Sequence, residues 1–486
     1  MTLPGVARAV HRSKLDALAE EAVVSDPSAQ STPRIQTSAT QSRARTLFGI
    51  GSGNAMEWFD WGVYTTFTPF FASQFFHSGD PVSDVLYALV VFAVGFVARP
   101  FGGWLFGWIA DRRGRKLSMT LTVALAALGS LAIGISPNYA AIGIGASIVL
   151  VLARLAQGLA HGGELPSAQT YIAETAPKER RGLWSSLIYF SGTIGQLAGT
   201  LLAAILSTWL SREAMNAFGW RVPFLLGGVF GLYALYMRLR MHETEVFVDE
   251  AVHDEPTTSD EARLRTRKGA IWRTVKEHPK LLFQVVGMTM GGTVLYYAWA
   301  ISAPAYAINV LHVPAAGALW AGVAAQVVFL IVLPLWGILS DRIGRKPVLI
   351  ASVVGLAALT YPLNAMLTTS PWSLFFAMTI ALVLLGGFTA IGPAVFAEIF
   401  PTRIRAVGLA VPYSIAVALF GGTAPYLQTY FAGLQMTSTF IWYSAALGLL
   451  SGLVVLFTLP ETRGIDLRDK TVGAHGRRRS LGADIS

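Results

Sequence analysis

Charged residues inside long apolar segments are the first feature of this sequence that could do chemistry. Glu57, Asp60 and Arg99 lie in apolar segments near 46–76 and 85–110, well away from the polar loops. An ionisable side chain at the centre of a bilayer costs about 2.5–3.5 kcal/mol on insertion scales, so it needs a reason to be there. The handling of protons or of a charged solute is the usual functional reason. A static ion pair between helices is the structural alternative.

Glu57, Asp60 and Tyr64 share one face of the first apolar segment, because they are spaced at i, i+3 and i+7. At 1.5 Å per residue, the two carboxylates lie roughly 16–22 Å along the segment. A desolvated carboxylate can take up a proton near neutral pH. We therefore predict that at least one of the two couples protons to transport, and that Tyr64 lines the substrate site. An ion pair that locks helices together is the alternative.

Two arginines could bind an anionic substrate. Arg99 lies midway along the second apolar segment, and a guanidinium group stays charged and binds carboxylates in a two-pronged geometry. We predict that Arg99 binds a substrate carboxylate. Pairing with Glu57 or Asp60 is the alternative, and exchange between internal and substrate carboxylates would couple protons to solute. Arg221 follows Trp220 near the end of the sixth segment, and either guides substrate or anchors the helix at the interface.

The fourth apolar segment carries a polar stripe. Arg154, Gln157, His161 and Glu164 fall within about an 80° arc of one continuous helix at 100° per residue. Glu164 is a candidate proton carrier, and we assign Arg154 to the same coupling site. His161 titrates near neutral pH when unperturbed, although a lone histidine is more often a hydrogen-bonded packing residue.

The substrate-site candidates of the second half are aromatic or amide side chains: Tyr296, Tyr297, Trp299, Gln326 and Tyr413. The first three lie in a stretch whose glycines and Pro304 permit a bend. Aromatic residues there could line a pocket, although such a stripe more often serves packing.

Several kinds of chemistry are excluded by residues that the chain lacks. It has no cysteine, which excludes thiol catalysis, disulfides and Cys-ligated zinc or iron–sulfur clusters. It has no Gly-Lys-Ser phosphate loop for ATP and no histidine pair with zinc spacing. We predict no enzyme, no cofactor and no metal site. The net charge of +9 sits at helix ends and tails, so we also predict no nucleic-acid partner.

The elements that must position these residues are membrane spans. The chain is 53% hydrophobic and 13% charged, with a mean hydropathy of +0.52, whereas soluble domains carry about 25% charged residues. Segments of about 20 or more apolar residues recur about twelve times. They lie near 46–76, 85–110, 117–136, 141–173, 183–209, 220–240, 280–309, 315–340, 347–368, 372–398, 406–431 and 437–459.

Basic residues gather in alternate connections between these spans. The basic connections are DRRGRK (111–116), PKERRG (177–182), the stretch from about 238 to 280, DRIGRK (341–346) and PTRIR (401–405). By the positive-inside rule, both termini and the central loop are cytoplasmic. We predict a multi-pass protein of a bacterial-type inner membrane.

The chain also repeats itself. GGWLFGWIADRRGRK (102–116) returns as LWGILSDRIGRK (335–346), and Glu174, Pro177 and Arg181 return as Glu398, Pro401 and Arg405. Two halves with one orientation put a substrate site between them, near the midplane. The predicted parts are a disordered N-terminal tail (1–45), a six-helix half (46–240), a linker (241–279), a second six-helix half (280–460) and a basic tail (461–486).

These repeated loops resemble the signature loop of the major facilitator superfamily. NAMEWFDW (54–61), FVARPFGG (96–103), RLAQGLAHGGE (154–164) and GWRVPF (219–224) resemble the metabolite:H⁺ symporter family, whose members transport α-ketoglutarate, citrate, shikimate and proline or betaine. TYIAE (170–174) and ALFGGTAPY (418–426) look most similar to its α-ketoglutarate-transporting members.

The resemblance implies an all-α polytopic major facilitator fold with two pseudo-symmetric halves. It implies proton-coupled uptake of a small organic acid, such as the dicarboxylate α-ketoglutarate, by alternating access. It also implies that the charged loop residues latch the cytoplasmic side; these are Asp111, Arg115, Asp341 and Arg345. Uptake of a zwitterion such as proline or betaine is the first alternative. A transport-inactive sensor that signals through the linker or tails is the second.

Overall fold

The computed structural model describes residues 36–113, 115–162, 164–239, 279–400 and 405–467. It divides into two units, 1–48 and 49–486, and the bundle described below belongs to the second. Every regular element in the described residues is helical. The predicted N-terminal tail up to residue 35, the linker up to residue 278 and the basic tail from residue 468 lie outside the described residues.

The helices of the first half follow the order of the predicted spans. They are α2 (Gln36–Phe75), α3 (Pro81–Arg113), α4 (Arg115–Ile135), α6 (Ile144–Ala160) followed by α7 (Glu164–Thr175), α8 (Arg181–Trp209) and α10 (Arg221–Leu239). Short elements join them: α5 (Tyr139–Ile142), a 3₁₀ turn (Lys178–Arg180), α9 (Arg212–Ala214) and a π-helical turn (Met215–Gly219).

The second half repeats this arrangement. Its helices are α13 (Pro279–Tyr296), α14 (Ala303–Asn309), α15 (Ala315–Ile343), α16 (Arg345–Ala365), α17 (Pro371–Ile399), α18 (Arg405–Ala416), α19 (Ala424–Gly433) and α20 (Thr437–Thr458). One π-helical turn, Tyr297–Ile301, joins α13 to α14, and another, Val417–Gly421, lies between α18 and α19. Each of these two pairs forms one predicted span.

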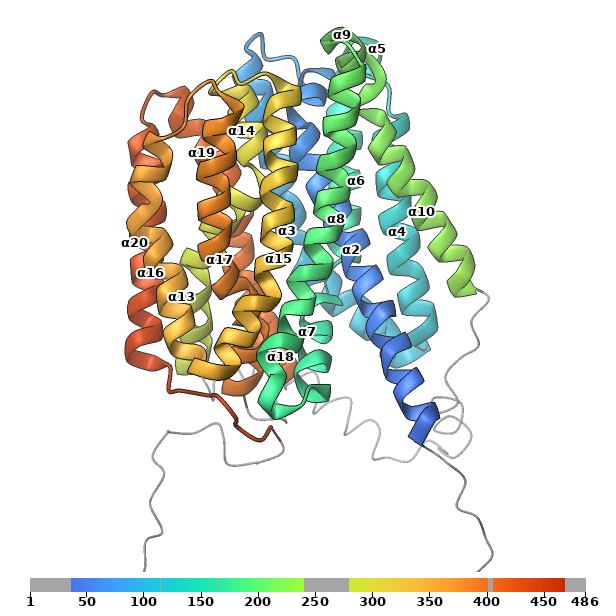
Figure 1. The fold of residues 1–486 in the computed structure, drawn as a ribbon. Helices are drawn as coiled ribbons and strands as arrows, with labels where there is room; N and C mark the ends of the chain where they lie inside the picture. The colour runs from blue at the N-terminus through green and yellow to red at the C-terminus, as the bar shows by residue number, and fades with distance from the viewer. Residues whose placement is uncertain (1–35, 114, 163, 240–278, 401–404, 468–486) are drawn as a thin grey trace, which may run out of the picture. The chain divides into compact units, whose positions relative to one another are not determined.

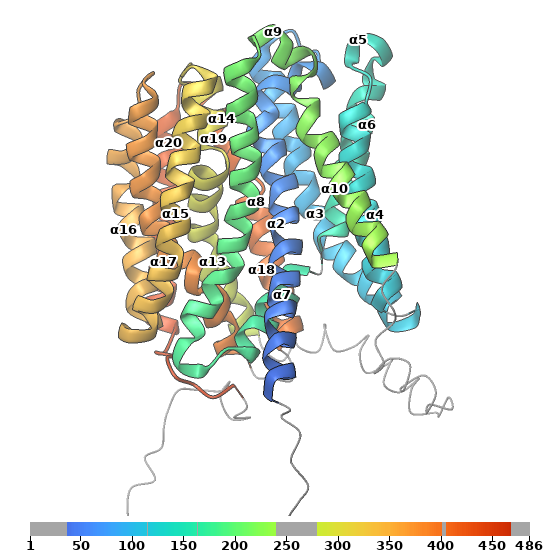
Figure 2. The same ribbon diagram turned by 45° about the vertical axis from the view of Figure 1, so that its right-hand side comes forward.

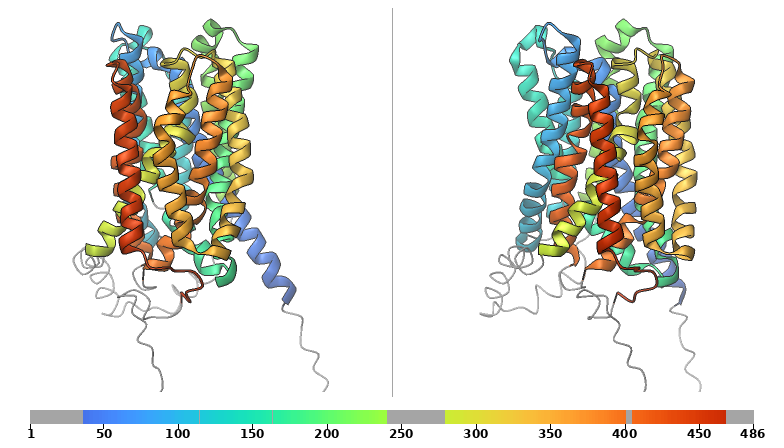
Figure 3. Two further views of the ribbon diagram at one scale, coloured as in Figure 1. Left: turned by 60° about the vertical axis from the view of Figure 1, so that its left-hand side comes forward. Right: turned by 90° about the vertical axis from the view of Figure 1, so that its left-hand side faces the viewer.

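The lengths and composition of the helices suit a bilayer. In the described ranges, 10 helical stretches are long and apolar enough to cross a membrane. The first span, α2, and the fourth, α6 with α7, complete the predicted set. Figures 1 and 2 show that the helices of 49–467 pack side by side, with their axes tilted about one common axis. Figure 3 brings α20 to the front, where it packs on α13 and α16.

The two ends of the bundle differ in what they carry. Where α8 begins and α15 ends, α7 and α18 also lie (Figure 1), and we call this the latch end. Elements α5 and α9 lie at the opposite, distal end. The halves meet where α8 packs along α15 and α17, and where α3 approaches α18 and α19.

Four predicted spans differ clearly from the structure in their start or continuity. The first helix begins at Gln36, before the expected start at 46. The fourth span is not one helix: α6 ends at Ala160 and α7 begins at Glu164. The stripe that was to include Glu164 on one continuous face is therefore corrected, because the HGG sequence that follows Ala160 interrupts the helix. The seventh and eleventh spans are likewise divided by their π-helical turns.

Glycine allows α3 and α6 to touch. A Cβ atom added at Gly102 would overlap the carbonyl of Leu159 on α6, so the backbones approach more closely than any side chain permits. At the turn between α15 and α16, Gly344 has a φ of 107°, a conformation that favours glycine.

Replacing Gly102 with valine should therefore push α3 away from α6. Overpacking of this kind costs about 1–3 kcal/mol, and we expect the thermal unfolding midpoint of detergent-solubilised protein to fall by about 1–3 °C. Gly107→Val is the matched control, since it lies on the same helix and a Cβ there would meet no atom within 4 Å. Equal midpoints for the two variants would contradict the close approach.

Candidate functional site

A cavity between the two halves holds most of the aromatic candidates. Its cavity volume is about 10 Å³, within about 290 Å³ of space free of protein atoms that includes open solvent. Its lining residues come from α2, α3 and α8 on one side and from α13, α17, α18 and the two π-helical turns on the other: Trp58, Arg99, Tyr189, Thr293, Tyr296, Tyr297, Phe388, Tyr413 and Val417. Among the described lining residues, Arg99 carries the single charge. The cavity therefore offers one cation, within mostly aromatic walls, to an anionic group of a ligand.

Tyrosine hydroxyl groups supply the other polar atoms of the cavity wall. The hydroxyls of Tyr189 and Tyr413 lie 3.2 Å apart and bond across the two halves. Tyr296 packs edge-on against Trp58, Tyr189 and Tyr297, with ring centroids 5.5–5.6 Å apart. Within the described residues, the hydroxyls of Tyr296 and Tyr297 have no protein partner. They are free to donate to a ligand oxygen.

Arg99 faces both the cavity and an internal carboxylate. Its Nη2 lies 3.7 Å from Oε1 of Glu57, and the Glu57 side chain is 4% exposed. His161 Nδ1 lies 4.0 Å from the same oxygen. Three of the predicted charged candidates therefore meet at one point, beside the cavity. The guanidinium group of Arg99 thus lies within ion-pair distance of an internal carboxylate and also lines the cavity.

A second buried polar chain also reaches the ring of Trp61, through Arg154. Arg154 Nη1 donates to Oε1 of Gln157 at 2.7 Å, and Gln157 Nε2 donates to the Ser130 hydroxyl at 2.8 Å. That hydroxyl donates to Oδ1 of Asp60 at 3.0 Å. In the described part of the chain, no cationic nitrogen lies within 4.0 Å of the Asp60 carboxylate. The charge of Asp60 reaches Arg154 only through two neutral side chains.

Four substrate-site candidates lie away from the central cavity. The Tyr64 hydroxyl donates to the Ala88 carbonyl at 2.8 Å, and Trp299 is buried in the π-helical turn without lining the cavity. Gln326 Nε2 donates to the hydroxyl of Thr200 at 3.3 Å, across the contact between α15 and α8. These three contacts are interhelical packing in this conformation.

Arg221 is the fourth. Its Nη1 donates to the carbonyls of Gly134 and Ser136 at 2.9 and 2.6 Å. Those carbonyls lie at the end of α4 and have no partner further along the helix. Its guanidinium carbon also lies 4.4 Å from the Trp220 ring centroid. Its position supports the anchoring alternative rather than substrate guidance.

A second, distal cavity lies between the same halves. Its cavity volume is about 10 Å³, within about 260 Å³ of space free of protein atoms that includes open solvent. Hydroxyl and amide groups dominate its polar wall: Thr65, Thr68, Ser302, Tyr306, Asn309 and Thr429. Each lies several residues further along its span than the residues of the central cavity. Near it, Gln196 of α8 donates to the Ala300 carbonyl in the π-helical turn. A side chain of the first half is thus bonded to the backbone of this turn.

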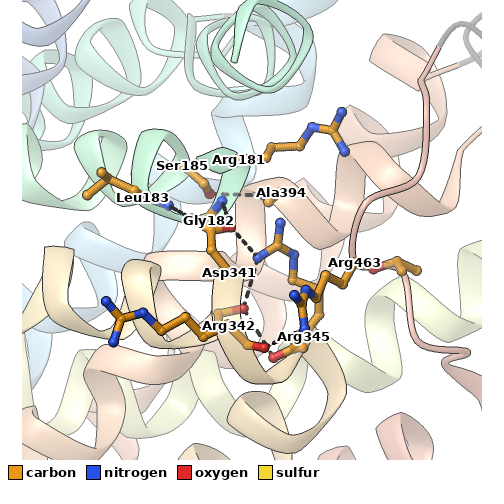
Figure 4. A network of polar contacts seen from close by, with 12 residues as sticks. Arg181, Gly182, Leu183, Ser185, Asp341, Arg342, Arg345, Ala394 and Arg463 are labelled. Atoms are coloured by element: carbon orange, nitrogen blue, oxygen red, sulfur yellow. Dashed lines mark hydrogen bonds and ion pairs between the residues drawn. The ribbon is translucent and has the colours of Figure 1, made fainter. Parts of the chain in front are cut away.

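The latch end is closed by a carboxylate that caps a helix of the other half. Asp341 Oδ1 and Oδ2 accept from the backbone N–H groups of Gly182 and Leu183 at 2.8 and 2.9 Å, as Figure 4 shows. These are first-turn donors of α8 that lack an intrahelical partner. Arg345 Nη1 pairs with the same Oδ1 at 2.7 Å and holds the carboxylate in place.

Glu398 forms the centre of this latch. Its Oε1 lies 2.9 Å from Nη1 of Arg181 and 3.5 Å from Nη2 of Arg345, and its Oε2 accepts from the Thr462 hydroxyl at 2.6 Å. Arg181 also donates to the Ile465 carbonyl at 3.0 Å. One buried carboxylate thus joins both halves and the segment after α20.

Some functional residues were not predicted from the sequence. Arg181 and Glu398 appear in the internal repeat, and a repeated charged pair was a usable signal for the latch. Trp58, Tyr189 and Phe388 carry no such signal, because an aromatic residue in a lipid-facing or packing position looks the same in sequence. The side chains of Asp111, Arg115 and Glu164 lie outside the described part of the chain. No cluster of metal-ligating side chains occurs among the described residues.

Comparison with known proteins gives a consistent result. The family model described as "Sugar (and other) transporter" matches residues 47–472. The α-ketoglutarate permease of Escherichia coli (strain K12) is 34% identical over 455 residues, which cover 93% of this chain and 100% of that protein. A glycine betaine/proline/ectoine/pipecolic acid transporter of Dickeya dadantii (strain 3937) is 33% identical over 427 residues, covering 87% and 84%.

A solved structure shares the fold. The crystal structure of a D-xylose–proton symporter superimposes with a TM-score of 0.67 at 20% sequence identity, covering 87% of this chain and 99% of that one. At this identity the likeness concerns the fold alone. It confirms the predicted major facilitator fold of about twelve helices in two halves.

Neutralising Glu398 should open the latch end. Removing one partner from a buried ion pair costs about 3–5 kcal/mol, so Glu398→Gln should raise the population of the state open at this end. Since the chain has no cysteine, Thr293→Cys provides a single reporter in the central cavity. We expect its maleimide labelling rate in detergent to rise about tenfold or more.

Two controls make this measurement specific. Glu213→Gln removes an exposed carboxylate at the distal end and should leave the rate unchanged. A reporter in the distal cavity, Thr429→Cys, should not label faster in Glu398→Gln, since alternation opens one end at a time. An unchanged rate at Thr293→Cys in folded protein would show that Glu398 does not hold the latch.

Proposed function

The chain belongs to the family of sugar (and other) transporters in the major facilitator superfamily, and from this premise we propose that it is a proton-coupled symporter for a small organic acid. A dicarboxylate such as α-ketoglutarate is the proposed substrate. The observation that carries the proposal is the position of Arg99, which lies at an aromatic cavity and beside an internal carboxylate, Glu57, at 3.7 Å. Arg99 can exchange one carboxylate partner for another.

The cavity supports an acid with more than one oxygen-bearing group. One carboxylate pairs with Arg99 in a charge-assisted contact. The unpartnered hydroxyls of Tyr296 and Tyr297 and the hydroxyl of Thr293 can donate to the remaining oxygens. The aromatic walls cover the carbon chain between them. This arrangement requires no metal and no cofactor.

Charge balance supports proton coupling. Arg99 and Arg154 offset Glu57 and Asp60 while the cavity is empty, and an entering dicarboxylate adds two negative charges in a medium where unpaired charge is costly. A proton on Asp60 would offset one of them without breaking a direct ion pair, and the hydroxyl groups of the cavity can donate to the second carboxylate. A proton on Glu57 would instead leave Arg99 without its internal partner. We therefore assign the transported proton to Asp60. Glu57 has the role of pairing with Arg99 while no substrate is bound.

The orientation follows from the distribution of basic residues. Lys178, Arg181, Arg342 and Arg463 all lie at the latch end, and basic connections stay on the cytoplasmic side of the inner membrane. The latch end is then cytoplasmic, and the distal cavity faces the outside. Rocking of the halves about the central cavity would expose Arg99 to each side in turn.

One observation favours a second candidate substrate. A zwitterion such as betaine or proline could place its carboxylate on Arg99 and its ammonium group against the π faces of Trp58, Phe388 and the tyrosines. No observation in the described residues favours the third alternative, a transport-inactive sensor.

The test is uptake into proteoliposomes that hold the purified chain. We expect saturable uptake of radiolabelled α-ketoglutarate that an inward proton gradient drives above equilibrium, and weaker uptake of betaine and proline. Arg99→Gln should raise KM about a hundredfold, because truncating one partner of a buried charge pair costs about 2–5 kcal/mol. Gradient-driven uptake of betaine or proline alone would keep the mechanism and replace the substrate.

Arg221→Gln is the matched control for Arg99→Gln. It removes a second guanidinium group from the same half, but one that bonds backbone carbonyls. We expect KM within about threefold of the unmodified chain and a lower thermal unfolding midpoint. A hundredfold rise in KM for this variant would instead restore its substrate-guiding role.

The proton assignment has its own test. Asp60→Asn should reduce gradient-driven accumulation to the level seen without a gradient, while counterflow exchange of substrate stays within about threefold, since exchange moves no net proton. Glu57→Gln should keep accumulation and lower KM, because Arg99 loses its internal competitor. Asp84→Asn, a buried aspartate that accepts from Ser78, is the control. The reverse pattern would assign the proton to Glu57.

A further inference from the structure

We infer that Trp61 is a positioning residue that couples the substrate site to the proton site. This inference rests on the proposed function and adds a residue that neither touches the substrate cavity nor carries a proton. Trp61 is not among the residues that line the cavity. Its ring contacts one guanidinium group of each of the two buried polar systems described above.

Two guanidinium groups share the ring of Trp61. The Arg99 guanidinium carbon lies 4.2 Å from the ring centroid, and the Arg154 carbon also lies 4.2 Å from it. Because each distance is 4.2 Å, the two guanidinium carbons are less than about 9 Å apart. A π face attracts each cation, while the two like charges repel one another. The ring lets both cations stay buried close together.

Each of these arginines serves a different carboxylate. Arg99 pairs with Glu57 and lines the cavity. Arg154 reaches Asp60 through Gln157 and Ser130. The two systems meet at Trp61, since both guanidinium carbons lie 4.2 Å from its ring centroid.

The ring is held tightly in this place. Trp61 is 2% exposed, and its ring contacts Phe92, Phe96 and His161 with centroids 5.3, 4.3 and 6.2 Å away. A Cβ added at Gly95 would approach the ring to 2.9 Å, so the neighbouring helix leaves room for an indole and little more. A ring fixed in this way transmits a displacement of one arginine to the other.

The guanidinium group of Arg154 has N–H donors that form no hydrogen bond with a described residue. Its Nε and Nη2, and Nε of Arg99, are buried without a hydrogen-bond acceptor among the described residues. When a substrate carboxylate draws Arg99 toward the cavity, Glu57 loses its direct cation. Of the two arginines, Arg154 is then the one that remains in place. A proton on Asp60 removes the negative charge that Arg154 otherwise offsets.

Trp61 makes proton uptake by Asp60 a condition for substrate binding at Arg99. With the ring present, each arginine stays beside its own carboxylate until substrate and proton have both arrived. Without the ring, either arginine can compensate either carboxylate, and substrate can bind while Asp60 stays charged. Transport would continue, but the proton gradient would no longer drive it.

The experiment compares two activities of the same proteoliposomes: counterflow exchange of the transported substrate, and accumulation driven by an inward proton gradient. We expect Trp61→Leu to keep exchange within about threefold and to lose about tenfold or more of the accumulation. Trp61→Phe keeps a π face and should recover at least about half of it. The proton flux per substrate molecule, read as alkalinisation during uptake, should fall with the accumulation.

Trp220→Leu is the matched control. Trp220 is also fully buried in the first half and also has a guanidinium group over its ring, that of Arg221 at 4.4 Å. It has no contact with either carboxylate system. We expect any loss in this variant to affect exchange and accumulation equally, because it would come from packing.

The outcomes separate the inference from the proposed function. If the unmodified chain shows no gradient-driven accumulation of any acid or zwitterion tested, the proposed function fails and the inference falls with it. If the unmodified chain accumulates substrate, an equal loss of both activities in Trp61→Leu and Trp61→Phe would assign the ring a purely structural role. Unchanged accumulation in Trp61→Leu would equally overturn the inference.

Discussion

The compensation of buried guanidinium charge is the constraint on which the rest of this structure depends. Arginine keeps its charge in a low-dielectric interior, and Arg154 and Arg345 are both fully buried. Each must therefore have anionic, polar or π-electron neighbours at short range. Arg99 has Glu57 and Trp61, Arg154 has Gln157 and Trp61, and Arg345 has Asp341 and Glu398.

The two charge clusters have different partners and so different uses. At the latch end, Arg181 and Arg345 share Glu398, which ties α8 of the first half to α16 and α17 of the second. The partners of this cluster are all parts of the protein, so it stores a preference for one conformation. At the central cavity, Arg99 has one internal partner and one open face. That open face gives a ligand a way to alter the charge balance.

The sequence predicted the fold and part of the site. Twelve spans, two halves and a site between them followed from apolar length and from repeated loops, both of which depend on local composition. The meeting of Glu57, Arg99 and His161 was only partly foreseen, since it needs α2, α3 and α6 to converge. The break after Ala160 was missed because an apolar segment with one internal His-Gly-Gly still reads as a continuous span. Trp58 and Tyr189 were missed because helical periodicity does not say which aromatic faces a cavity.

The π-helical turn at Tyr297–Ile301 gives the second half a mechanical property that the first half lacks in α2 and α8. A π turn holds one residue more than an α turn in the same rise. Converting it to α geometry would rotate α14 by about 100° relative to α13. Tyr306 and Asn309, which now face the distal cavity, would turn away from it. Gln196 bonds Ala300 inside this turn, so the rotation would break a contact that spans both halves. The geometry of this turn is therefore linked to α8 of the opposite half through the bond from Gln196.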